Sequence, residues 1–355
     1  MPPELRGLLV INRLADLFPA MLLAASTALI VAPLIIRILP SLGLVDLPGS
    51  ALHKQHASPT PMAGGPVLAV ALIVSYGVLR PPLDRDVIGI LAGAGLMLVW
   101  GILDDRLDLG PLQKLAGQLL AAVLLIYFGV QVRMLRMAWP DLLLTGVWVV
   151  GITNAFNFVD SMDGLALGLG GIAAAFFMLV TIDSGQPFLA SLSAAIFGAT
   201  VGAYFFNAAP AQMFLGDSGA QLLGFLLAAI GIAYTPASAG LPQGVTWFTP
   251  ILVLGVPIFD MTLVVASRIR RRRPIYLANR DHTYHRLVTL GLDRTRSVLA
   301  MQLAAIMLGL IAFIALDASV LAANVIFACI ALVGLAAIGF VERADIGRAA
   351  SAPEQ

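Results

Sequence analysis

The chain is built from a succession of uncharged apolar runs, each about 20 residues long, with short polar segments between them. A helix of this length crosses the hydrocarbon core of a bilayer and satisfies its own backbone hydrogen bonds, which an irregular segment facing lipid cannot do. Only 12% of the residues are charged, whereas a soluble domain carries about 25%. We therefore predict an all-α, polytopic membrane protein. The expected spans are Leu17–Ile36, Pro59–Leu79, Val87–Leu103, Leu115–Val132, Leu142–Val159, Gly164–Ile182, one near residues 188–206, two within Ser218–Phe259, Ser297–Leu316 and Ala318–Val341, about eleven in total.

The basic residues indicate which way the chain crosses the membrane. About eleven spans put the two termini on opposite sides of the bilayer. If the N-terminus lies outside, most of the basic residues fall inside, including Lys54, Lys114 and the arginine-rich segment 268–296. Basic loops are preferentially cytoplasmic. We therefore expect an outside N-terminus, a cytoplasmic C-terminus and a single integral membrane domain over residues 1–355, with the polar motifs between residues 46 and 290.

Five polar clusters fall on the side of the membrane that this topology makes cytoplasmic. Because the topology was derived from apolar runs and basic residues, this agreement is partly independent support for one shared site. The clusters are His53–His56, Asp104–Asp108, Asn154–Asp163, Asn207–Asp217 and Arg280–Arg286.

The cluster at the end of the fifth span is hard to explain as ordinary loop residues. Asn154, Asn157, Asp160 and Asp163 recur at a spacing of three and would form one stripe on a helix. An ionisable group in mid-membrane costs about 2.5–3.5 kcal/mol, so such residues usually have a functional reason. For Asp260, inside the ninth span, a structural role as partner of a buried donor and a direct catalytic role are both open.

The gathered carboxylates would repel one another without a cation. Magnesium prefers oxygen ligands, takes few protein carboxylates and completes its shell with water and substrate phosphates. Asp104, Asp105 and Asp217 are the candidate ligands. Gly216 and Gly219 allow the backbone to approach a phosphate, and the helix that begins there would favour an anion at its N-terminus. His282, His285 and the flanking arginines are candidates for contacting phosphate.

These motifs, in this order, resemble the polyprenyl-phosphate N-acetylhexosamine-1-phosphate transferase superfamily. The resemblance runs from about Asp46 to Leu287 and rests on five motifs. They are Lys54-x-His56 with Pro61-x-x-Gly64-Gly65, Asp104-Asp105-x-x-Asp108, Asn154-x-x-Asn157-x-x-Asp160-x-x-Asp163-Gly164, Phe214-x-Gly216-Asp217-x-Gly219, and Arg280-Asp281-His282-x-x-His285-Arg286.

The resemblance implies transfer of a sugar-1-phosphate from a UDP-sugar to undecaprenyl phosphate, with magnesium or manganese as cofactor and UMP as product. By position, Asp104 or Asp105 would act as base or nucleophile, and both a direct displacement and a covalent intermediate stay open. Asp217 would bind the metal, with Asp104 and Asp105 as further candidates. The residues expected to contact the nucleotide sugar are Asn157, Asp160, Asp163, Asn207, Phe214, Lys54, His282, His285 and Arg286.

The last motif favours one branch of the superfamily. This motif contains the segment His282-Thr283-Tyr284-His285 and not the three consecutive histidines of one branch. It is closer to the other branch, which starts O-antigen, common-antigen, teichoic acid or capsule chains with N-acetylglucosamine (GlcNAc) or a related sugar. The resemblance implies a multi-pass protein of the bacterial inner membrane with a cytoplasmic site. It is compatible with a homodimer, and we expect no nucleic-acid partner. An intramembrane prenyltransferase and a secondary transporter are the alternatives, although the polar residues gather at one face instead of at the midplane.

Overall fold

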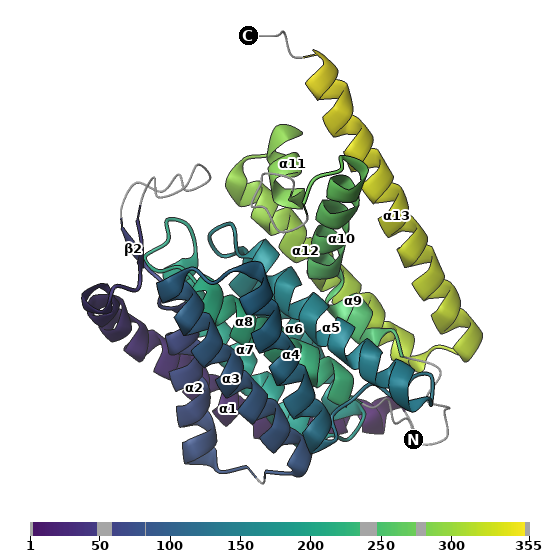
Figure 1. The fold of residues 1–355 in the computed structure, drawn as a ribbon. Helices are drawn as coiled ribbons and strands as arrows, with labels where there is room; N and C mark the ends of the chain where they lie inside the picture. The colour runs from purple at the N-terminus through teal and green to yellow at the C-terminus, as the bar shows by residue number, and fades with distance from the viewer. Residues whose placement is uncertain (1–2, 48–58, 82, 235–246, 275–281, 352–355) are drawn as a thin grey trace.

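The computed structural model describes residues 3–47, 59–81, 83–234, 247–274 and 282–351, and almost all of these are helical (Figure 1). This confirms the prediction of an all-α, polytopic membrane protein. The helices are α1 (Pro3–Ile38), α2 (Gly64–Leu79), α3 (Arg85–Leu107), α4 (Pro111–Phe128), α5 (Ala138–Val159), α6 (Leu165–Asp183), α7 (Pro187–Asn207), α8 (Gly216–Ala233), α9 (Thr249–Val253), α10 (Gly255–Arg270), α11 (Thr283–Thr289), α12 (Arg294–Ile314) and α13 (Val320–Ser351), with short 3-10 turns η1 (Leu39–Leu42) and η2 (Ala315–Asp317).

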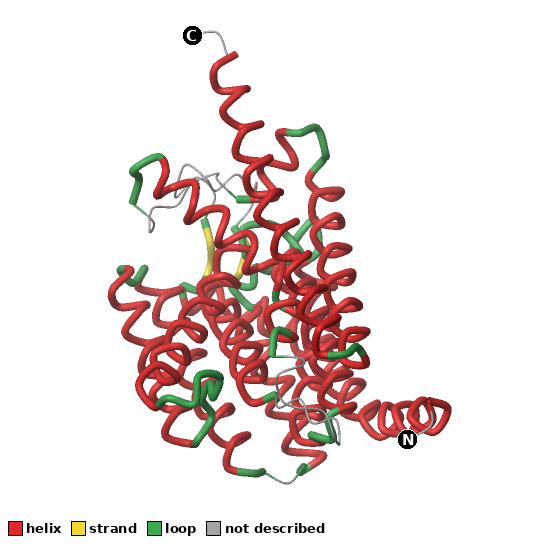
Figure 2. The backbone as a smooth tube through the Cα atoms, turned by 90° about the vertical axis from the view of Figure 1, so that its right-hand side faces the viewer, coloured by secondary structure: helices red, strands yellow, loops and turns green. Residues whose placement is uncertain are grey.

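Every predicted span falls on a helix. Among the described residues, nine helices are long and apolar enough to cross a bilayer, and α2 is a shorter apolar helix. The expected ninth span corresponds to α9 and α10, which are separated by a break at Leu254. The number of crossings and their orientation remain predictions. Figure 2 shows the N-terminal part of α1 projecting sideways from the bundle, so α1 extends well beyond the run expected from Leu17.

The centre of the bundle is α8, which packs against α2, α3, α5, α6 and α7 (Figure 1). Its apolar window is 78% buried inside the protein, whereas the corresponding window of α13 is only 6% buried. The fold therefore holds the first turn of α8 in a fixed frame, whereas the described part of the chain leaves most of the apolar window of α13 uncovered.

Glycines allow neighbouring elements to come unusually close to this first turn. A Cβ atom on Gly65 would lie 2.4 Å from Ser218 Oγ, and one on Gly101 would lie 2.4 Å from Ser218 Cα. Gly216 itself has a φ of 72°, a left-handed conformation that favours glycine. The first turn of α2 and the last part of α3 are thus held close against the start of α8.

A short sheet and a backbone bridge also hold the segment before α2 against the segment before α8. Strand β1 (Val45–Asp46) pairs antiparallel with β2 (Thr60–Pro61). The Phe214 N–H donates to the Pro61 carbonyl over 2.9 Å, and the Gly64 N–H donates to the Phe214 carbonyl over 3.0 Å. The first and fourth sequence motifs therefore meet through their backbones.

Candidate active site

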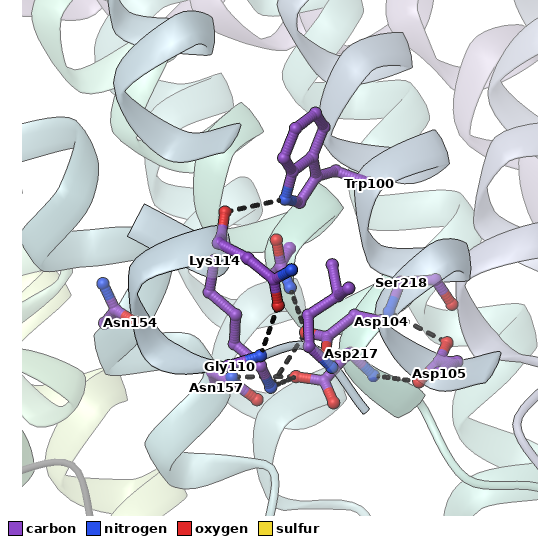
Figure 3. A network of polar contacts seen from close by, with 12 residues as sticks. Trp100, Asp104, Asp105, Gly110, Lys114, Asn154, Asn157, Asp217 and Ser218 are labelled. Carbon is purple, nitrogen blue, oxygen red and sulfur yellow. Dashed lines mark hydrogen bonds and ion pairs between the residues drawn. The ribbon is translucent and has the colours of Figure 1, made fainter. Parts of the chain in front are cut away.

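The centre of the polar site is Lys114, near the start of α4. Its Nζ atom lies 2.8 Å from Asp104 Oδ2 and 3.1 Å from Asp217 Oδ1 (Figure 3). Asn157 Nδ2 donates to the same Asp217 oxygen over 2.9 Å. Four helices, α3, α4, α5 and α8, thus bring these side chains to one point. The predicted convergence of the second, third and fourth motifs is present in the structure.

The carboxylate of Asp104 is held entirely by protein donors. Oδ1 accepts from the Leu109 N–H at 3.0 Å, and Oδ2 accepts from Gln221 Nε2 at 3.0 Å as well as from Lys114. The Asp104 side chain is only 1% exposed, whereas that of Asp217 is 28% exposed. Asp217 is therefore the more accessible of the two carboxylates that share the lysine.

Asp105 caps the N-terminus of α8. Its two oxygens accept from the Asp217 N–H at 2.7 Å and the Ser218 N–H at 3.1 Å (Figure 3). A carboxylate at this position satisfies backbone donors that a helix leaves unpaired and interacts favourably with the helix dipole. The sequence predicted that this helix end would favour a substrate phosphate. In the structure these two N–H groups instead bind Asp105.

Asp160 and Asp163 add two more carboxyl groups to the same region. Asp160 is the C-cap of α5, and Asp163 Oδ2 accepts from the Ala211 N–H at 3.2 Å. Burial raises the pKa of Asp160 well above its usual range, and the negative charges of Asp217, Asp105 and Asp163 raise that pKa further. A cation bound nearby would relieve this repulsion.

The donor set fits a hard divalent cation. The acidic groups offer oxygen atoms, and Lys114 is the cation in direct contact with this cluster within the described part of the chain. Those same residues contain no ready-made group of three acidic, histidine or cysteine side chains that could hold a metal. Magnesium usually binds one or two protein carboxylates and completes its shell with substrate phosphates and water.

Asn207 and Phe214 lie beside the cluster, where they hold neighbouring segments of the chain together. Asn207 is buried, its Oδ1 accepts from the Gly164 N–H at 3.1 Å, and its Nδ2 donates to the Met213 carbonyl at 3.0 Å. Asn207 thereby joins the third motif to the fourth. Its predicted contact with the nucleotide sugar, like that of Phe214, stays a prediction.

The histidine motif reaches the site through α11. His282 Nδ1 lies 2.9 Å from Asp260 Oδ2, and the Thr283 N–H donates to Asp260 Oδ1 at 2.6 Å. Asp260 therefore has the structural role, as partner of buried donors. The His282 ring makes an edge contact with the Phe158 ring, with centroids 5.7 Å apart, which places α11 beside the end of α5.

The other predicted residues of this motif have protein partners too. His285 Nε2 lies 2.8 Å from the Tyr284 hydroxyl. Arg286 is buried, bonded to Ser267 and paired with Glu342. Lys54, His56 and Arg280, which belong to predicted motifs, lie outside the described residues.

Several residues of the site were missed by sequence reasoning. Lys114 was considered only as a topological charge, although it lies ten residues after Asp104 on the expected cytoplasmic side. Gln221 stands four residues after Asp217, one helical turn away, and that spacing is the signal that could have identified it. Glu342 directly follows the last predicted span, which was ended at Val341.

Deeper in the bundle, Gln118 and Asn154 form a reciprocal carboxamide pair. Asn154 Nδ2 donates to Gln118 Oε1 at 2.7 Å, and Gln118 Nε2 donates to Asn154 Oδ1 at 3.3 Å. Of the predicted stripe, Asn157 reaches the cluster while Asn154 joins α5 to α4.

Comparison with known proteins gives a consistent picture. The family model described as glycosyl transferase family 4 matches residues 87–235. A probable undecaprenyl-phosphate N-acetylglucosaminyl 1-phosphate transferase of Bacillus subtilis (strain 168) is 33% identical over 306 residues, which cover 82% of this chain and 83% of that protein. A decaprenyl-phosphate N-acetylglucosaminephosphotransferase of Mycobacterium tuberculosis (strain ATCC 25618 / H37Rv) is 32% identical, with 78% and 76% covered. An undecaprenyl-phosphate alpha-N-acetylglucosaminyl 1-phosphate transferase of Escherichia coli (strain K12) is 26% identical, with 79% and 78% covered.

Proposed function

Because the chain belongs to glycosyl transferase family 4, in the branch of the polyprenyl-phosphate GlcNAc-1-phosphate transferases, we propose that it starts a cell-surface glycan on a lipid carrier. The reaction transfers a sugar-1-phosphate, of the GlcNAc type, from a UDP-sugar to undecaprenyl phosphate or a related polyprenyl phosphate. The products are a polyprenyl-diphosphate sugar and UMP. The single observation that supports this assignment best is the convergence of Asp104 and Asp217 on Lys114, with Asn157 hydrogen-bonded to Asp217. A prenyltransferase or a transporter does not fit these relatives.

We propose that the transfer is a direct displacement. An oxygen of the lipid phosphate attacks the phosphorus that bears the sugar, a new P–O bond forms, and the P–O bond to UMP breaks. Both oxygens of Asp104 and both oxygens of Asp105 accept hydrogen bonds from the protein, and the Asp104 side chain is 1% exposed. Such carboxylates are suited to positioning Lys114 and α8 more than to attacking phosphorus.

The direct displacement is tested by isotope exchange. Purified protein is incubated with labelled UMP and a UDP-sugar in the absence of lipid acceptor. We expect no label in the UDP-sugar, because no covalent enzyme intermediate forms. Exchange of label that depends on Asp104 or Asp105 would contradict the direct mechanism.

We propose that magnesium, or manganese, is the cofactor, and that Asp217 and Asp160 are its protein ligands. Asp217 is the accessible carboxylate of the cluster, and Asp160 is subject to burial and to the negative charges of Asp217, Asp105 and Asp163. The cation would neutralise the diphosphate and stabilise the departing UMP. Lys114 and Asn157 would hold Asp217 in one orientation. His282, His285, Lys54, Asp163 and Phe214 remain the proposed contacts to the nucleotide sugar.

We further propose that this site opens to the cytoplasm of a bacterial inner membrane. Arginines end α10 close to α11, and basic residues accumulate on the inner side of membranes. A single cysteine at the exposed position Asp108, in a Cys329→Ala background, tests this orientation. A membrane-impermeant maleimide should label it only after the cells are permeabilised.

The expected homodimer can be tested in the same membranes by chemical crosslinking.

The reaction itself is tested with purified protein, undecaprenyl phosphate and a panel of UDP-sugars. We expect UMP release that requires the lipid acceptor, and release from UDP-GlcNAc above the other donors. Asp217→Asn should lose activity while it still inserts and purifies. No UMP from any UDP-sugar, or UMP release without the acceptor, would refute the proposed function.

A further inference from the structure

Glu342 is an unexpected acidic residue in α13. The apolar window of this helix is only 6% buried by the described residues. Glu342 nevertheless has a buried side chain, 6% exposed, that is directed toward the bundle. Ionisable groups in membrane-spanning helices face the protein interior and pair there. The side chain of Glu342 therefore marks a specific contact between α13 and the rest of the protein.

The partners of Glu342 come from two other helices. Arg286 NH2, in α11, lies 2.8 Å from Glu342 Oε1, and the Arg286 side chain is 5% exposed. Arg270 NH2, in α10, lies 3.3 Å from Glu342 Oε2, but the Arg270 side chain is 51% exposed. Arg286 NH2 also donates to Ser267 Oγ in α10 at 3.0 Å. One carboxylate thus ties α10, α11 and α13 together.

The helix that this ion pair holds is α11, which has only seven residues and is too short to be stable alone. It carries His285 and begins directly after His282. Asp260 holds its first turn through His282 and Thr283, and Glu342 holds its middle through Arg286. Packing against α12 and burial of Tyr284 also hold α11, and the Arg286–Glu342 contact is the buried ion pair that fixes its middle.

We propose that Glu342 and Arg286 are positioning residues, which through their buried ion pair keep α11 and its two histidines in place beside the end of α5. This inference rests on the proposed function and revises one expectation from the sequence. Arg286, predicted to contact the nucleotide sugar, acts through Glu342 instead. The C-terminal helix is thereby part of the catalytic framework, although it contributes no group to the reaction.

The test is a double-mutant cycle of Glu342→Gln and Arg286→Met, with kcat and KM for UDP-GlcNAc measured for each variant. If the pair acts as a unit, each single variant lowers kcat by at least about 10-fold, and the double variant is no worse than either. KM should change much less than kcat. Arg270→Gln is the matched control, because it removes the exposed partner of the same carboxylate and should stay within about threefold of wild type.

Two measurements keep the inference testable if Glu342→Gln is poorly produced. Glu342→Asp keeps the charge but shortens the side chain, and it should express well with a smaller loss of kcat. Hydrogen exchange of residues 283–289 should be faster in the Glu342 variants than in wild type or Arg270→Gln. Three results would overturn the proposal. They are wild-type turnover in Glu342→Gln, unchanged hydrogen exchange of residues 283–289, and losses of kcat that multiply in the double variant together with a raised KM.

These outcomes are distinguishable from failure of the proposed function. If wild-type protein releases no UMP from any UDP-sugar, the function is wrong, but the hydrogen-exchange comparison still decides whether the ion pair holds α11. If wild-type protein is active and the Glu342 variants behave like it, only the positioning role is wrong.

Discussion

Gly101→Ala is a severe test of how closely α3 and α8 must approach for activity. A Cβ atom at this position would lie 2.4 Å from Ser218 Cα, 2.7 Å from Ser218 N and 2.9 Å from the Asp217 carbonyl oxygen. All three are backbone atoms, so no side-chain rotation can relieve the overlap. Carbon atoms pack at about 3.5–4.0 Å, so the first turn of α8 must move by roughly 1 Å.

That displacement has two measurable effects. Overpacking of this kind costs about 1–3 kcal/mol in stability. A shift of about 1 Å in a catalytic group costs about 100-fold in rate, and here the moving turn carries Asp217. The hydrogen bonds from α8 to Asp105, at 2.7 Å and 3.1 Å, would lengthen at the same time.

The assay compares Gly101→Ala with Gly95→Ala. Gly95 lies on the same helix, and nothing lies within 4 Å of the Cβ position there. Both changes replace glycine by a better helix former, so the steric contact with α8 is the difference between them. We expect Gly95→Ala to keep wild-type UMP release and melting temperature. A Gly101→Ala variant with unchanged turnover would refute the reasoning that this contact sets the position of Asp217.

Four further predictions follow from the site. Lys114→Met leaves the Asp104 carboxylate buried without its cationic partner. The variant should therefore lose about 3 kcal/mol of stability in a thermal-unfolding assay, and it should also lose turnover. Asp105→Asn removes a negative charge at the N-terminus of α8 and should lose about 0.5 kcal/mol by the same assay, together with activity. Gln221→Leu removes one of the donors to Asp104 and should lower kcat by about 10-fold, whereas a pure packing role would leave kcat unchanged. The raised pKa of Asp160 means that the folded, metal-free protein binds a proton more tightly than the unfolded chain does, so its stability falls as pH rises through that pKa. Because magnesium must displace this proton, the increase in melting temperature with magnesium should grow as the pH is raised, EDTA should abolish it, and an increase that does not change with pH would count against Asp160 as a ligand.

Much of this fold was accessible from sequence because the bilayer imposes a simple rule. Apolar length alone located the helices, and the positions of polar motifs at their ends indicated one shared site. The convergence of Asp104, Asn157 and Asp217 followed from topology without any knowledge of helix packing. The break between α9 and α10 and the sideways N-terminal part of α1 did not follow, because hydropathy reports burial in lipid and not helix direction.

What the sequence did not reveal were the partners of each polar group. Lys114 and Gln221 reach Asp104 only because α4 and α8 pack on either side of α3 in a particular register. Register depends on close contacts such as those at Gly65 and Gly101, which a single sequence does not identify. For the same reason the sequence predicted Asp105 as a base, nucleophile or metal ligand and Arg286 as a contact to the nucleotide sugar, but it did not predict the partners that both have within the protein.

The carboxamide pair of Gln118 and Asn154 has a consequence for how such enzymes diverge. Each amide supplies both a donor and an acceptor to the other, and the Gln118 side chain is excluded from solvent. Replacing one amide by an apolar residue leaves the other with unsatisfied groups, whereas replacing both by apolar residues of matching shape can be nearly neutral. Across a lineage, these two positions should therefore mutate as a couple, and an alignment in which either one drifts alone would show that the link between α4 and α5 is dispensable.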